Sequence, residues 1–170
     1  LSLLFANKLI RKISLNDNNN FKIISEEIKR REKLINFTPF LIKNTDFPFF
    51  DTMPQNSVSL INLNSIKDFE NKINYKIDHE RFRGNIYIDR ADPWVEFSWL
   101  GKEILVNNCP FKVFKKIRRC SATSLMLNSD KSDINLPSKL REVYGHIDMG
   151  VYLKPLNNGT INNNDKIQLV

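Results

Sequence analysis

Short apolar stretches that alternate with polar residues dominate the chain after Arg81, and they constrain the fold more than any other feature. They predict strands at 86–88, 95–99, 104–106, 111–117, 122–127, 150–154 and 167–170, and a similar run predicts one at 58–61. Many short strands with few helices are typical of a barrel or a twisted sheet. The sequence therefore predicts a mainly β fold of the α+β class, a mainly antiparallel β-barrel with short peripheral helices.

Three helices are expected outside the strands, at 26–34, 63–73 and 138–144. The first is predicted to begin after Ser25, with acidic residues in its first turn. The second repeats apolar residues near period 3.6 and follows Asn62 or Asn64, either of which suits an N-cap. The third is bracketed by Pro137 at its start and Gly145 just past its end.

The length of 170 residues suits one domain, or one domain with a fragment of another. No apolar run approaches the roughly 20 residues that span a bilayer, so no membrane partner is expected. The two cysteines, Cys109 and Cys120, form no CxxC pair, and only two histidines accompany them. This usage argues against a disulfide framework and a structural zinc site, and it predicts a reducing, cytoplasmic location.

The net charge of +7 invites a nucleic-acid interpretation. Most lysines are scattered along the chain, however, as an AT-rich coding sequence would also produce. No aromatic RNA-binding signature or recognition-helix pattern accompanies them. A basic, non-catalytic nucleic-acid-binding module is therefore the lowest-ranked alternative, and nucleic acid is not the expected partner. Its mark would be a salt-dependent affinity that does not need Cys120.

One basic segment is dense, because five of the eight residues at 112–119 are Lys or Arg, and Cys120 follows directly. Nearby cations favour thiolate over thiol, and the thiolate is both the nucleophile and the metal ligand. Guanidinium groups bind phosphate through paired hydrogen bonds. A thiolate with Arg83, Arg118 and Arg119 would thus suit an anionic, phosphorylated, metal-bearing cofactor. The alternative is a buried structural cysteine beside an exposed basic strand.

Five short motifs follow one another in an order and spacing that resemble the MOSC domain family, named for the C-terminal region of molybdenum cofactor sulfurase. They are RFRGN (81–85), WxGK (99–102), RRCSAT (118–123), YGHIDMGVY (144–152) and GTIxxxD (159–165). The resemblance runs from about residue 58 to residue 170, and we expect the MOSC domain to occupy 25–170. Residues 1–24 would be the tail of a β-rich N-terminal subdomain that is truncated here, since the chain begins with Leu.

The resemblance implies a MOSC-type β-barrel that binds the molybdenum cofactor (molybdopterin) or carries sulfur as a cysteine persulfide. By position, Cys120 would be the catalytic cysteine and the ligand to molybdenum, with Arg119 beside it in the matching RC pair. Ile117 replaces the first cysteine of the C-x-R-C pattern that many members show, so no vicinal dithiol can form. Asn164 stands before Asp165 where the family has glycine, and asparagine tolerates the left-handed conformation of such a turn.

The other implied cofactor contacts come from distant segments. Arg83 and Asn85 match the arginine and asparagine of the family's FRxN segment and would contact the pterin and its phosphate. Tyr152 matches the tyrosine of the G-V-Y strand that faces the same site. Ser65 lies at a helix start that resembles a further cofactor contact. We expect the cysteine, the arginines, the asparagine and the tyrosine to converge on one concave site, with the thiol reachable from solvent.

The resemblance favours part of a molybdenum-dependent oxidoreductase, similar to the reductases of N-hydroxylated compounds such as the mitochondrial amidoxime reducing component. The alternative with the same fold is a persulfide carrier that delivers sulfur to another metalloenzyme. An electron-transfer protein would be the partner in the first case and a cysteine desulfurase in the second. Pyridoxal phosphate would enter only through such a desulfurase, because the chain has no lysine motif for it.

Overall fold

The computed structural model describes residues 2–5, 8–12, 18–31 and 56–170. The chain divides into two compact units, Leu1–Phe49 and Phe50–Val170. In the first unit, strands β1 (Ser2–Phe5) and β2 (Lys8–Lys12) pair antiparallel, and helix α1 spans Asn18–Arg31. Ser25 lies inside α1, so this helix begins earlier than predicted, and the boundary expected after residue 24 falls within it.

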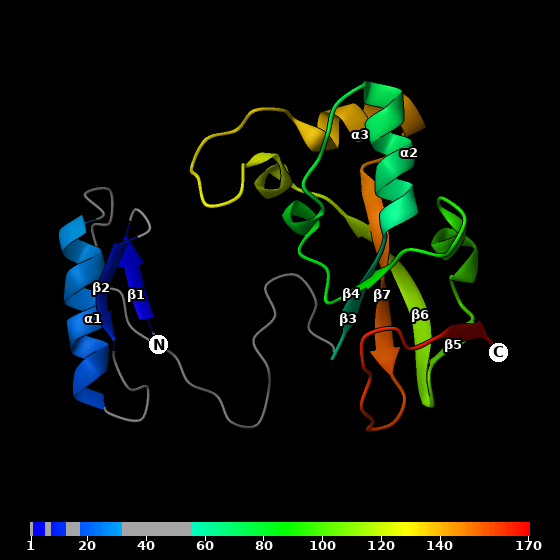
Figure 1. The fold of residues 1–170 in the computed structure, drawn as a ribbon, viewed down its shortest axis with the longest axis horizontal. Helices are drawn as coiled ribbons and strands as arrows, with labels where there is room; N and C mark the ends of the chain where they lie inside the picture. The colour runs from blue at the N-terminus through cyan, green and yellow to red at the C-terminus, as the bar shows by residue number, and fades with distance from the viewer. Residues whose placement is uncertain (1, 6–7, 13–17, 32–55) are drawn as a thin grey trace. The chain divides into compact units, whose positions relative to one another are not determined.

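The second unit is a curled, mixed sheet of six strands in the order β4-β3-β7-β6-β5-β8 (Figure 1). Their bounds are β3 Val58–Asn62, β4 Ile86–Ile88, β5 Glu103–Val106, β6 Cys109–Arg118, β7 Asp148–Pro155 and β8 Ile167–Leu169. Only the β3–β4 pair of this sheet is parallel. No ladder joins β4 to β8 in the described residues, so the barrel-like sheet keeps two edges. The predicted β-barrel-like α+β fold is confirmed.

Two apolar clusters support the sheet. One joins the strands through fully buried residues such as Leu60, Ile104 and Val113. The other packs helices α2 (Leu63–Ile73) and α3 (Leu136–Tyr144) against the sheet, through Phe69 and Leu140 among others. Figure 1 shows both helices near one end of the sheet. Burial of these side chains, each contributing about 1.5–3 kcal/mol, fixes the sheet that carries the candidate site.

The ends of both helices follow the predicted signals. The Asn62 side chain accepts a hydrogen bond from the Asn64 backbone N–H (3.0 Å), which identifies Asn62 as the N-cap of α2. Gly145 ends α3 in the left-handed region with φ 76°, as the glycine position predicts. Asn164, at φ 72°, likewise adopts the left-handed conformation expected of the last turn. In the described part of the chain, no helix is both long and apolar enough to cross a bilayer.

Two predicted strands are wrong. Residues 95–99 form a 3-10 helix, η2 (Val95–Trp99), because Trp94 turns the chain at φ 66° and the side chain of Glu96 is buried instead of its apolar neighbours. Residues 121–124 form another, η3 (Ser121–Ser124), in which the Thr123 hydroxyl donates to the Cys120 carbonyl (2.8 Å). Such a local side-chain bond competes with strand pairing.

Candidate functional site

Arg83 ends a short turn at the start of the segment RFRGN. This turn, η1 (His79–Phe82), is capped by the Asp78 carboxylate, which accepts from the Glu80 N–H (3.0 Å). Arg83 follows in the left-handed region at φ 49°, and its N–H donates to the Glu80 carbonyl (2.9 Å). Its exposed guanidinium makes no hydrogen bond or ion pair with another described residue. The turn therefore holds the backbone and leaves the cation available.

Asn85 is fixed against strand β3 by Ser59. The Asn85 Oδ1 accepts from both the N–H (3.0 Å) and the hydroxyl (2.8 Å) of Ser59, and the Asn85 N–H donates back to Ser59. Gly84 allows this approach, because a Cβ there would lie 2.7 Å from Ile61 and 2.9 Å from the Tyr87 ring. The bonds use the amide oxygen of Asn85 and leave its Nδ2 donors without a partner among the described residues.

Strand register places Tyr152 beside Ser59 and Asn85. Ser59 lies opposite Tyr152 on β7, and Tyr152 lies opposite Lys115 on β6. Directly opposed residues share a face of the sheet, so Asn85, Ser59, Tyr152 and Lys115 form one line across four segments. The half-buried Tyr152 ring stacks on Phe114 with ring centroids 6.1 Å apart, and its hydroxyl has no hydrogen bond to a described residue. We call this line, with Arg83, the polar row.

Arg119 is an internal anchor. Its Nε and Nη2 donate to the Met149 carbonyl, and its Nη1 donates to the Phe82 carbonyl (2.9 Å). The guanidinium lies 5.3 Å from the centre of the Phe82 ring, and the residue is only 9% exposed. Arg119 thus ties the end of β6 to β7 and to the η1 turn. Contact with a cofactor stays a prediction for this residue.

Burial lowers the pKa of Arg119 to about 10, although the nearby phenols of Tyr152 and Tyr87 oppose that shift. The side chain therefore remains protonated at neutral pH. Because no carboxylate forms an ion pair with it among the described residues, its charge is compensated by carbonyl dipoles. The site consequently keeps a fixed positive charge at the end of β6, close to Tyr152.

Cys120 directly follows this anchor and is exposed, which agrees with a thiol reachable from solvent. Its carbonyl accepts from the N–H (3.2 Å) and hydroxyl (2.8 Å) of Thr123, so the chain turns immediately after the cysteine. The predicted alternative of an enclosed structural cysteine is wrong for Cys120. The buried cysteine is Cys109, which is 8% exposed and begins β6.

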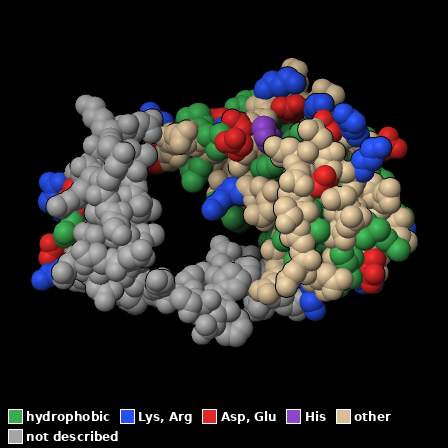
Figure 2. Space-filling model, turned by 60° about the horizontal axis from the view of Figure 1, so that its bottom comes forward, with side chains coloured by type: hydrophobic (Ala, Val, Ile, Leu, Met, Phe, Trp, Pro, Cys, Tyr) green, Lys and Arg blue, Asp and Glu red, His purple; other side chains and the backbone are tan. Residues whose placement is uncertain are grey.

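The five cationic side chains at 112–119, ahead of Cys120, do not form one cluster around the thiol, because they make different contacts. Lys112 lies 4.0 Å from a Glu103 carboxylate oxygen, and the Lys116 ammonium lies 4.4 Å from the centre of the Phe97 ring. Arg119 is turned inward on carbonyls, as described above. Arg118 is exposed and has no ion pair, hydrogen bond or ring contact with a described residue. On the face shown in Figure 2, Lys and Arg side chains are interspersed with Asp and Glu.

Ser65 belongs to a separate, buried network. Its hydroxyl donates to the Glu96 carboxylate (2.8 Å) and accepts from the Trp94 N–H (2.7 Å). Asn62 donates to the same carboxylate (3.0 Å), and both Ser65 and Glu96 are fully buried. Burial raises the pKa of Glu96. Among the described residues no hydrogen bond connects this network to the polar row. Asn62 lies three residues along β3 from Ser59, about 10 Å away.

Sequence reasoning missed Ser59 and the partners of Arg81. Ser59 is one of many serines, and only the parallel β3–β4 register places it beside Asn85. Arg81 forms a paired ion bridge with Asp133 through Nη1 (2.8 Å) and Nη2 (2.7 Å), and the Tyr75 hydroxyl donates to the same carboxylate (2.6 Å). The spacing of 52 residues between Arg81 and Asp133 gives no local signal for this contact.

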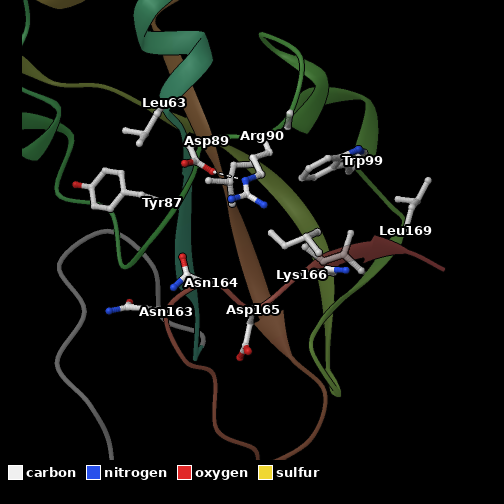
Figure 3. A pocket seen from close by; sticks show the side chains of 14 residues that line it. Leu63, Tyr87, Asp89, Arg90, Trp99, Asn163, Asn164, Asp165, Lys166 and Leu169 are labelled. Carbon is white, nitrogen blue, oxygen red and sulfur yellow. Dashed lines mark ion pairs between the residues drawn. The ribbon is translucent and has the colours of Figure 1, made fainter.

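A cavity of about 740 Å³ lies between the free edges of the sheet, at β4 and β8 (Figure 3). Its wall combines apolar side chains such as Trp99 and Leu169 with the charged Asp89, Arg90 and Lys166. None of the predicted site residues lines it. Of the predicted site residues, Arg83, Asn85 and Tyr152 lie in the polar row, Arg119 and Cys120 lie at the end of β6, and Ser65 lies in the buried network with Glu96. The cavity is thus a separate feature of the open barrel.

Comparison with known proteins agrees with the resemblance found in the sequence motifs. A family model described as the MOSC domain matches residues 48–168, which is more than half of the chain. No curated protein matches the chain. The match covers all six strands of the second unit to within one residue, together with the polar row, Arg119 and Cys120. The chain therefore belongs to the MOSC domain family.

Proposed function

We propose that this protein binds the molybdenum cofactor, with the Cys120 thiolate as the protein's ligand to the metal, as part of an oxidoreductase. The family is generally associated with molybdenum cofactor sulfurase-like proteins. When bound, the metal centre would supply the redox chemistry. The residues of this chain would bind and orient the cofactor.

The observation that carries the proposal is the set of available polar groups along the polar row. The Arg83 guanidinium, the Asn85 Nδ2 and the Tyr152 hydroxyl have no hydrogen-bond partner among the described residues, while their backbones are held by strand pairing and by Ser59. Arginine suits phosphate, and amide and hydroxyl groups suit the polar edge of a pterin. Fixed backbones with unused donors are what a preorganised anionic ligand site requires.

The ligand set also bears on the kind of metal that the site could hold. The described residues contain no group of three or more His, Cys, Asp or Glu that could hold a metal ion. Cys120 would thus be a single protein ligand, which suits a metal that arrives with ligands of its own on an organic cofactor. The donor chemistry of the described residues fits molybdopterin in this respect.

A persulfide carrier is the second candidate, because the exposure of Cys120 would serve sulfur transfer equally well. We propose a cytoplasmic location for either function, which the two free cysteines support. An electron-transfer protein would be the partner in the first case and a desulfurase in the second.

The test is molybdenum analysis and pterin fluorescence on the full chain, expressed in a host that makes the cofactor. We expect near-stoichiometric molybdenum in the wild type and its loss in Cys120→Ser. Cys109→Ser is the matched control, because the buried Cys109 donates only to the Thr160 carbonyl (3.6 Å), which a hydroxyl can also do.

Two outcomes decide against the proposal. Cyanide-labile sulfur on Cys120 without molybdenum identifies the persulfide carrier. A Cys120→Ser protein that keeps both its metal and its pterin rules out the thiolate as the ligand. Arg83→Ala is a second variant that should reduce cofactor retention without changing the fold, since the side chain is exposed and makes no hydrogen bond or ion pair with a described residue.

A further inference from the structure

The segment that carries Cys120 is attached to the η1 turn at two points. Before the cysteine, Arg119 donates to the Phe82 carbonyl (2.9 Å). After it, Asp133 accepts both Nη1 and Nη2 of Arg81 at 2.8 and 2.7 Å. Arg81 and Phe82 are adjacent in sequence, so one turn holds both ends of the segment 119–133.

The Asp133 attachment is a paired ion bridge that is partly enclosed, since the Asp133 side chain is 23% exposed. The Arg81 side chain is 7% exposed, and its Nε has no hydrogen-bond partner in the described part of the chain. The Asp133 carboxylate also accepts from the Tyr75 hydroxyl at 2.6 Å. These contacts hold the pKa of Asp133 well below its usual range, with the Arg81 hydrogen bonds as the main cause. A buried guanidinium with one carboxylate partner depends on that partner, because no other described residue forms an ion pair with it.

Both attachments converge on the residue that presents the available cation. Arg83 follows Phe82 directly, and its carbonyl oxygen lies 3.5 Å from the Ser59 hydroxyl oxygen, whose proton is donated to Asn85 Oδ1 (2.8 Å). This places Arg83 beside the polar row. Cys120 and Arg83 are related without a direct bond to each other. The η1 turn fixes the position of Arg83, and the two attachments of segment 119–133 to the same turn fix the position of Cys120.

We propose that Asp133 is a positioning residue for Cys120. Through Arg81, Asp133 attaches the C-terminal end of segment 119–133 to the η1 turn, which Arg83 follows. This attachment holds the Cys120 thiol in a fixed position relative to the polar row. This inference rests on the proposed function, because the role it gives to Asp133 is to hold the cysteine that would bind the cofactor.

The experiment measures amide hydrogen exchange on the full chain for wild type, Asp133→Asn and Asp130→Asn. Asp130 is the matched control, since it lies in the same loop, is exposed and has no ion pair or hydrogen bond with a described residue. In Asp133→Asn we expect exchange to quicken about tenfold in peptides covering 119–124 and 79–85, because charge-assisted hydrogen bonds are lost. The β5–β6 hairpin should stay unchanged, and Asp130→Asn should resemble the wild type throughout.

Alkylation of the two cysteines, followed peptide by peptide, separates positioning from unfolding. In Asp133→Asn the rate at Cys120 should change at least threefold, while the rate at the buried Cys109 stays at the wild-type value. Asp133→Glu should restore part of the wild-type rate, since it keeps the charge. Equal acceleration at both cysteines would mean general unfolding and would overturn the proposal, as would unchanged exchange in Asp133→Asn.

Molybdenum content supplies the link to function. If the wild type holds molybdenum, Asp133→Asn should hold less and Asp130→Asn the same amount. A wild type without molybdenum refutes the proposed cofactor, while the exchange and alkylation results still decide whether Asp133 positions Cys120. If the wild type does hold molybdenum and Asp133→Asn holds the same amount, the positioning role alone is refuted.

Discussion

Replacing Arg119 with alanine should destabilise the second unit by about 3 kcal/mol, because two buried carbonyls lose their donors. The Met149 carbonyl accepts from Nε and Nη2, and the Phe82 carbonyl accepts from Nη1. Each buried acceptor left without a donor costs about 1–3 kcal/mol. Removal of a desolvated cation offsets part of that cost, since burial already lowers the Arg119 pKa to about 10.

The measurement is urea denaturation of the full chain, followed by tryptophan fluorescence. Arg118→Ala is the control, because Arg118 is the adjacent arginine, is exposed and has no ion pair or hydrogen bond with a described residue. Its effect should stay within about 0.5 kcal/mol of the wild type. Arg119→Lys should fall between the two, since an ammonium group lacks the planar fork that reaches both carbonyls. An Arg119→Ala protein no less stable than Arg118→Ala would refute the anchoring role.

The remaining predictions concern backbone geometry and pH. Gly150→Ala should destabilise the protein by more than Gly101→Ala: both glycines have positive φ (80° and 79°), but only at Gly150 would a Cβ lie 2.5 Å from the Leu60 carbonyl oxygen. Equal denaturation midpoints for the two variants would contradict the close approach. Because burial raises the pKa of Glu96, the folded state keeps its proton to higher pH, and stability falls as pH rises above the pKa of the unfolded carboxyl, about 4.3. Glu96→Gln should therefore raise the thermal midpoint at pH 8, with a difference that shrinks towards pH 4, and a lower midpoint at pH 8 would contradict this. Asp133 acts in the opposite direction: its lowered pKa gives stability that is present above about pH 4 and is lost in acid, so wild type and Asp133→Asn should converge as pH falls.

Most elements of the second unit could be predicted because their signals are local. Alternation of apolar residues identifies β3 to β8, since successive side chains of a strand point to opposite faces. Asn62 and Gly145 mark helix ends because a cap needs only the residues beside it. The motif order, including RRCSAT around the exposed Cys120, was likewise sufficient to identify the family.

The two wrong strands show where local alternation fails. At 95–99 the buried residue is Glu96, whose carboxylate accepts from Asn62 and Ser65, over thirty residues away in the sequence. Hydropathy cannot anticipate a buried carboxylate whose partners come from another element. After Cys120 the hydroxyl of Thr123 binds the cysteine carbonyl and ends the strand, although the apolar residues continue.

What the sequence alone determined is therefore the six strands of the sheet in the second unit, the helix caps and the choice of Cys120, Arg83, Asn85 and Tyr152 as candidate ligands. Only the tertiary structure decided how they are held: strand register places Ser59 between Asn85 and Tyr152, and burial turns Arg119 inward to the Met149 and Phe82 carbonyls. The physical reason is range. Periodicity and capping depend on neighbours within one turn or strand, whereas a buried charge or an unpaired amide is satisfied by whichever distant segment the completed fold brings beside it.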